Sequence, residues 1–243
     1  MPDVSVHPRN TRHHLTVVAQ IGQRIVGGEY AIGQILPREK EFVDELEVGR
    51  GVVREAVRVL ASKGLVEARP KRGTQVLPTS RWQQLDPDIL GWRISGDSGG
   101  HFLRDLMELR AMIEPAASAH AAVRASDTDL SLISSLAREL KQSEDHEEHL
   151  IETDMRFHKA LLTASHNDLL MQASAAIEAS LRLSREVTVS MGHFARVAKH
   201  ADVADAIIAR SPARARRAMS QLIEMSSADI TSVLGSSWLQ EGI

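Results

Sequence analysis

The chain has 243 residues, 43% hydrophobic and 25% charged, with a formal net charge of −3, a composition typical of a soluble globular protein with room for two domains. Cysteine is absent, which excludes disulfides and thiolate metal sites. No apolar run approaches the roughly 18 residues of a membrane span, and residues 1–14 lack the apolar core of a secretory signal, so we expect a cytoplasmic protein with no membrane partner.

The first third of the chain is predicted to form a winged helix-turn-helix, over residues 1–77. Apolar residues at helical spacing predict helices, and alternating residues around a Gly-bearing basic turn predict a β-hairpin. Two short helices followed by such a hairpin are typical of proteins that place a helix in the DNA major groove. The predicted elements are helices over about 13–27, 38–46 and 49–63, and strands over 65–67 and 74–77 with Pro70-Lys71-Arg72-Gly73 as the hairpin tip.

Positive charge gathers in this region. Residues 50–77 carry 7 Lys and Arg against 2 Asp and Glu, whereas residues 78–243 carry 17 against 23. Arg50, Arg54 and Arg58 recur at every fourth position, so they project from one helix face. A solvated face is the alternative, but a stripe on the second helix of a helix-turn-helix favours contact with base edges.

The hairpin tip adds a second set of candidate DNA contacts. We expect Lys71 and Arg72 to meet phosphates or the minor groove, where they would supply affinity that depends on salt.

The remainder of the chain is predicted to be a linker over residues 78–101 and an all-α antiparallel helical bundle over residues 102–243, which makes the fold mainly α. Trp82 and Trp92 make the linker more apolar than a free tether, so we expect it to dock on one domain. The predicted helices of the bundle cover about 102–124, 126–143, 147–165, 167–192, 196–210 and 212–234.

Several strings in this sequence resemble one known family. Residues 15–77 resemble the DNA-binding domain of the GntR superfamily, and the helical part resembles the FadR-type (FCD) effector domain. The subgroup that it resembles most is that of the D-galactonate-utilisation repressors. The strings that carry the resemblance are Leu36-Pro37-Arg38-Glu39-Lys40, Glu108-Leu109-Arg110-Ala111-Met112-Ile113-Glu114-Pro115, Asp154-Met155-Arg156-Phe157-His158, Ser165-His166-Asn167 and, for the subgroup, Ile25-Val26-Gly27-Gly28.

The resemblance implies a homodimer that binds a palindromic double-stranded operator and leaves it when a small carboxylate enters the helical domain. It also implies that Lys40, Arg50 and Arg54 contact DNA, with Gly73 at the wing tip. Lys40 stands where many members have Arg, so a point charge replaces a bidentate contact. Gly49 stands where Ser or Thr usually caps the recognition helix.

The resemblance further implies a ligand site in the helical domain. Arg110 would fork onto the effector carboxylate, although an i, i+4 salt bridge with Glu114 is a simpler interpretation. Asn167 is a second candidate effector contact, and its alternative role is that of a helix cap.

A divalent cation is the implied cofactor. Asp154, His158 and His200 stand at three of the four ligand positions, while Leu222 occupies the fourth. Three protein ligands can still hold Zn²⁺, Mn²⁺ or Ni²⁺. The alternative is that Asp154 and His158 only hydrogen-bond each other in a polar cavity.

The sequence therefore predicts a DNA-binding regulator rather than an enzyme, and a repressor released by a sugar acid such as D-galactonate. Regulation of another hydroxy-acid or aldarate pathway is the alternative. A remote one is a serine hydrolase that uses Ser98, because Gly96-Asp97-Ser98-Gly99-Gly100 matches Gly-x-Ser-x-Gly. That string lacks the strand which a nucleophile elbow requires, and a flexible linker explains it.

Overall fold

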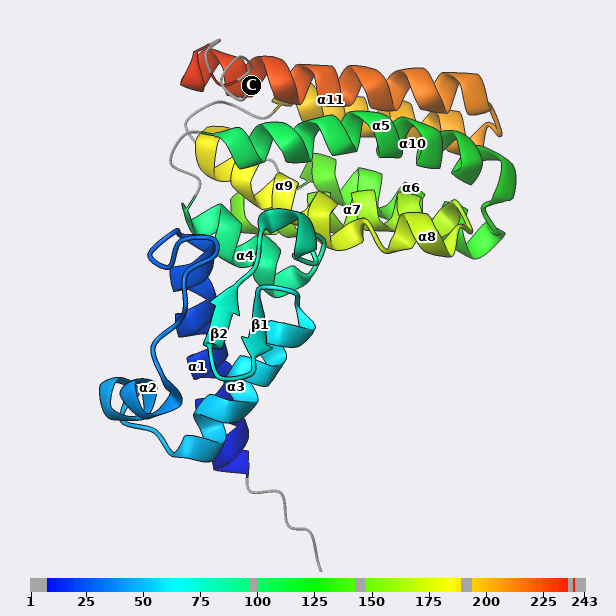
Figure 1. Ribbon diagram of the computed structural model, residues 1–243. Coiled ribbons are helices and arrows are strands. Elements are labelled where there is room, and N and C mark those ends of the chain that lie inside the picture. The colour runs from blue at the N-terminus through cyan, green and yellow to red at the C-terminus, as the bar shows by residue number, and fades with distance from the viewer. Residues whose placement is uncertain (1–7, 97–99, 143–146, 189–193, 236–237, 239–243) are drawn as a thin grey trace, which may run out of the picture. The chain divides into compact units, whose positions relative to one another are not determined.

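The computed structural model describes residues 8–96, 100–142, 147–188, 194–235 and 238 (Figure 1). The chain divides into two compact units, Met1–Gly96 and Asp97–Ile243. The first holds a winged helix-turn-helix and the second is all helical, so the predicted fold class is confirmed. None of the described helices is long and apolar enough to cross a membrane.

The first unit contains three helices, a two-stranded hairpin and a further helical segment. The hairpin is antiparallel, with Val66 opposite Val76 and Arg69 opposite Gly73. The elements are α1 (Pro8–Val26), α2 (Glu39–Leu46), α3 (Arg50–Ser62), β1 (Val66–Arg69), β2 (Gly73–Val76), the 3₁₀ turn η1 (Thr79–Arg81) and α4 (Pro87–Gly96).

One apolar core joins the helices of this unit. Ile21 of α1, Phe42 of α2 and Val53 and Leu60 of α3 are almost completely buried. Because these side chains lie on the inner face of each helix, the opposite face of α3, with its arginines, is left to solvent.

The segment after the hairpin packs on the first unit. Lys63, at the end of α3, binds Asp86 and Asp88 at 2.7 and 2.8 Å. The Trp92 ring of α4 lies against Gly22 of α1, so closely that a Cβ on Gly22 would stand 2.4 Å from ring atoms. The segment thus belongs to the first unit.

The second unit is a bundle of helices. In Figure 1, α5 runs beside α11, and α6 beside α7, in agreement with their contacts. The helices are α5 (His101–Arg124), α6 (Asp127–Gln142), α7 (Glu147–Ala164), α8 (Asp168–Met171), α9 (Ser174–Thr188), α10 (Phe194–Ile208) and α11 (Pro212–Leu234).

The prediction of one helix over 167–192 is wrong. The chain forms the single turn α8 and then begins again as α9. The Ala173 N–H donates to the Leu170 carbonyl, a tight i→i−3 closure, before Ile177 bonds back to Ala173 and α9 continues. No Gly or Pro marks this break, so the apolar periodicity alone could not reveal it. Residues 189–192 lie outside the described part of the chain.

Candidate functional site

The candidate DNA contacts lie on three elements of the first unit, and all of them are exposed. Lys40 stands in the first turn of α2. Arg50, Arg54 and Arg58 lie along α3, which begins at Arg50 with Gly49 as an N-cap that offers no side-chain hydrogen bond. Lys71, Arg72 and Gly73 form the hairpin tip.

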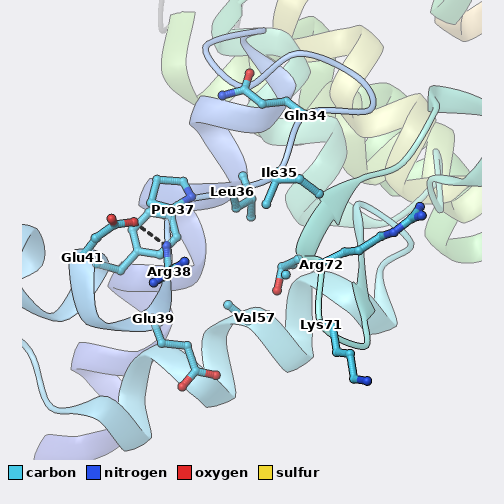
Figure 2. A pocket seen from close by; sticks show the side chains of 13 residues that line it. Gln34, Ile35, Leu36, Pro37, Arg38, Glu39, Glu41, Val57, Lys71 and Arg72 are labelled. Carbon is cyan, nitrogen blue, oxygen red and sulfur yellow. Dashed lines mark hydrogen bonds between the residues drawn. The ribbon is translucent and has the colours of Figure 1, made fainter.

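A hollow of about 640 Å³ separates the start of α2 from the hairpin tip. Figure 2 shows Arg38 and Glu39 on one side of it and Lys71 and Arg72 on the other, with Val57 of α3 between them. Arg38 is exposed and directly precedes α2, and its backbone N–H donates to the Glu41 carboxylate at 2.6 Å. It brings a third positive charge to the hollow.

The hairpin tip relies on left-handed backbone. Lys71 has φ 62° and Gly73 has φ 98°, and a Cβ on Gly73 would lie 3.0 Å from the Ile35 side chain. Glycine at position 73 is therefore required by both the backbone and the limited space.

The second candidate site is a buried cavity in the centre of the helical unit. It receives side chains from α5, α7, α9, α10 and α11. The space open to the centre of a water-sized sphere is only about 10 Å³, which is room for about one water or ion. Its lining consists of Arg110, Asp154, His158, Leu181, Ser184, Arg185, His200, Leu222 and Ser226.

Arg110 of α5 begins a buried chain of polar contacts. Its Nε donates to Glu114 Oε1 at 2.6 Å, and the other Glu114 oxygen bonds Nδ1 of His158. All three side chains are at most 2% exposed. The Arg110–Glu114 pair that the sequence left open is present, and it uses only one of the five N–H donors of the guanidinium.

Asp154 of α7 is held from two sides. Arg185 of α9 donates to Asp154 Oδ2 at 2.8 Å. On the other side, His200 Nε2 lies 2.7 Å and His158 Nε2 lies 3.5 Å from Asp154 Oδ1. Asp154 Oδ1 is buried and faces these two imidazole nitrogens, with no hydrogen bond of normal geometry among the described residues.

This arrangement fits a divalent cation with three protein ligands. One ligand atom from each of Asp154, His158 and His200 lies within 4.8 Å of the others. Glu114, by binding His158 Nδ1, turns Nε2 toward the shared centre, as outer-shell carboxylates do in histidine metal sites. Asp154 Oδ1, which faces both imidazole nitrogens, is the acceptor that a cation would share with them.

The charges of the cavity are strongly coupled. Burial would raise the pKa of Glu114, but the positive charges of Arg110 and His158 lower it to about 2. Burial likewise opposes ionisation of Asp154, yet Arg185 and His200 hold its pKa well below the usual value. Both carboxylates are therefore ionised near neutral pH.

The other predicted positions differ in their placement. Leu222 of α11 is 1% exposed and lines the cavity, so the fourth ligand position points inward but carries no donor. Asn167 does not line it; its Oδ1 accepts from the Leu169 and Leu170 N–H groups, which favours the helix-cap interpretation. Ser98 lies outside the described residues.

Two charged residues at these sites, Arg38 and Arg185, were not predicted from the sequence. Arg38 lies next to Lys40 within the quoted motif, so its position was the available signal. Arg185 is a cation on the buried face of a helix, four residues after Leu181. A charge in such a place is unusual, and it could have been singled out.

Comparison with known proteins matches each of the two units to a family. Residues 14–76 match the gntR family of bacterial regulatory proteins, and residues 105–225 match the FCD domain. The galactonate operon transcriptional repressor of Escherichia coli K12 is 36% identical over 172 residues, covering 71% of this chain and 75% of that protein.

Two further comparisons extend this agreement. The Uxu operon transcriptional regulator of Escherichia coli K12 is 34% identical, covering 66% of this chain and 62% of that protein. Among solved structures, a Streptococcus agalactiae GntR protein aligns with a TM-score of 0.50 at 27% identity, covering 88% of this chain and 98% of that one. These relatives are regulators of transcription or members of the same family.

Proposed function

This chain belongs to the GntR family of bacterial regulatory proteins and carries an FCD domain; from that membership we propose that it is a homodimeric repressor which a sugar-acid carboxylate, such as D-galactonate, releases from its operator. Its families and relatives are transcription regulators and not enzymes, and the chain is likewise a DNA-binding transcription regulator. The observation that carries the proposal is the buried Arg110 in a polar cavity of the helical unit.

The DNA side of the proposal assigns roles by position. Arg50 and Arg54 read base edges in the major groove, where Arg pairs with guanine O6 and N7. The phosphate backbone is contacted by Lys40, Arg58 and the hairpin tip. These contacts fix the orientation of the first unit on the DNA but do not read the base sequence. Exposure to solvent leaves these side chains accessible to DNA.

The effector side rests on Arg110. Its guanidinium retains N–H donors beyond the one that Glu114 engages. A ligand carboxylate would bind the remaining edge in a forked contact. Since the cavity has room for about one water, a larger ligand has to displace side chains or helices. That displacement would be the change that alters DNA binding by the first units of the dimer.

We assign the cation to Asp154, His158 and His200, with Zn²⁺, Mn²⁺ or Ni²⁺ as compatible ions. When bound, the ion would supply an open coordination position for an effector oxygen. The chain's own residues orient that position: Glu114 fixes the His158 ring and Arg185 fixes the Asp154 carboxylate. Leu222 limits the site to three protein ligands.

Two arginine variants test the proposal together. With a duplex selected by the wild-type protein from a random pool, Arg54→Ala should lose specific binding, by about 1–3 kcal/mol for each base contact removed. Arg110→Ala should bind that duplex normally but no longer leave it when D-galactonate is added. The charge-matched control is Arg216→Ala, on an exposed position of α11.

Gel-shift titration measures both effects. If the Arg54→Ala variant protects the duplex as the wild type does, Arg54 does not contact the bases. Normal release of Arg110→Ala by D-galactonate would refute the carboxylate contact. Arg110→Lys should be only partly active, because an ammonium cannot make the forked contact.

A further inference from the structure

A surface groove lies between α5 and α11, formed by other positions of the two helices that contribute Arg110 and Leu222 to the buried cavity. It encloses about 270 Å³, close to the lower end of ligand pockets. Met107, Ile223 and Trp238 form its apolar wall, and all three are buried. Glu108 and Glu224 bring exposed carboxylates to it.

Met107 contacts both the groove and Arg110. Met107 lines the groove, and its Sδ lies 3.9 Å from Nη1 of Arg110 and 3.5 Å from the Ser180 hydroxyl. Methionine is unbranched and has three rotatable side-chain bonds, so it changes rotamer more readily than a β-branched residue. A rotation of Met107 would move its Sδ away from the guanidinium.

The buried cavity alone cannot hold a six-carbon acid, because it has room for about one water. A ligand whose carboxylate reaches Arg110 needs further space for its carbon chain. The groove, whose lining includes Met107, offers this space. Its polar lining, including the hydroxyls of Ser220 and Ser227, offers hydrogen-bond partners for a row of hydroxyl groups.

The groove also has a charge preference. Among the described residues of its lining, Glu108 and Glu224 contribute two negative charges and Arg104 one positive charge, and Arg104 is also bonded to Asp105 at 3.3 Å. A hydroxyl can donate to these carboxylates, but a second ligand carboxylate would meet like charge.

We propose that the groove between α5 and α11 is the subsite for the hydroxylated tail of the effector, and that Glu108 and Glu224 select sugar acids with one carboxylate over those with two. The proposal rests on the proposed function, because it takes the carboxylate contact with Arg110 as given. It distinguishes an aldonate regulator from an aldarate regulator, which the sequence left open.

Isothermal titration of the full chain with D-galactonate and with galactarate, the six-carbon acid that carries a carboxylate at both ends, tests the selection. The wild type should prefer the aldonate by at least about tenfold, and Glu108→Gln or Glu224→Gln should each narrow that ratio by about threefold to tenfold, mainly through tighter aldarate binding. Glu152→Gln, which removes an exposed charge from α7, is the control and should leave the ratio unchanged. Raising the salt concentration should narrow the wild-type ratio in the same direction.

The outcomes separate the two proposals. If both glutamine variants keep the wild-type ratio while Arg110→Ala still abolishes binding, the groove assignment is overturned and the proposed function stands. A wild type that prefers the aldarate also overturns the assignment. If the wild type binds neither acid, the sugar-acid function falls together with the groove.

Discussion

At the scale of single residues, Glu114 is the most informative position of the helical unit. It bonds both Arg110 and His158, and its pKa lies at about 2 in the folded chain against 4.5 for an ordinary glutamate. A carboxyl whose pKa is lowered by folding stabilises the native state above its unfolded pKa, and this contribution is lost as the pH falls toward the folded value. Glu114 therefore ties the stability of the cavity to pH.

Glu114→Gln tests this link. In the presence of a chelator, the free energy of unfolding of the wild type should fall between pH 4.5 and pH 3, and the variant should be less stable at pH 7 but fall less steeply over that interval. Urea unfolding at a series of pH values measures both. Parallel pH profiles for the two proteins would show that Glu114 does not carry the linkage.

Leu222 is the residue that sets the cation site of this chain apart from a four-ligand one. It is buried in the same cavity as Asp154, His158 and His200. Leu222→His should add a nitrogen donor and tighten Zn²⁺ binding by about tenfold or more, which is roughly 1.4 kcal/mol. Competition with a chromophoric chelator measures this affinity.

The matched control places a histidine on a different wall of the cavity. Leu181→His, from α9, should give a smaller gain, because Leu181 is not at the fourth ligand position. Equal gains from both variants, or none from Leu222→His, would contradict the ligand assignment. Asp154→Ala should remove the bound ion from either background.

The residue scale also shows what sequence could and could not predict. Four-residue spacing on a helix predicted that Arg50 and Arg54 share one face and that Asp154 and His158 share another. Their roles in DNA and cation binding came from the helix-turn-helix pattern and the family resemblance, and they stay predictions. Arg185 meets Asp154 across two helices, 31 residues apart, and no spacing rule predicts which turn of one helix faces which turn of another.

At the scale of elements, the segment after the hairpin behaves as part of the DNA-binding unit. Lys63 joins the end of α3 to Asp86 and Asp88, and the Asp86 carboxylate also accepts the Asp88 N–H at the start of α4. The sequence predicted a docked segment from its tryptophans but could not identify the surface. That surface is set by Gly22, whose missing side chain makes room for the Trp92 ring.

Gly22→Ala should therefore destabilise the unit by about 1–3 kcal/mol, the usual cost of overpacking. The extra methyl would overlap the buried Trp92 ring. Thermal unfolding measures the loss. Trp92→Leu in the same chain should recover part of it by removing the ring, and the absence of any such coupling would contradict the proposed packing. Gly91→Ala, on α4 with open space around it, is the control.

The ends of the helices were predictable from the sequence in some places and not in others. The helices of the second unit begin and end close to their predicted limits, because Ser and Pro start signals and apolar periodicity mark them. The break between α8 and α9 escaped prediction because it is made by backbone hydrogen bonds alone. Local sequence held no residue with a special backbone preference there.

At the scale of the whole molecule, we expect effector binding by the helical unit to be linked to operator binding by the first unit. The effector has to bind more tightly to the form that holds DNA poorly than to the form that holds it well. A 100-fold weakening of operator binding corresponds to about 2.7 kcal/mol of coupling. The small size of the cavity supports such a coupling, since a bound sugar acid requires the helices or side chains around it to move.

The most direct test of this linkage is a fluorescence-anisotropy titration of labelled operator duplex with the wild-type protein, at a series of D-galactonate concentrations. We expect the operator dissociation constant to rise with D-galactonate and to level off at about 100 times its starting value. An operator affinity that stays constant while D-galactonate saturates the helical unit would contradict it.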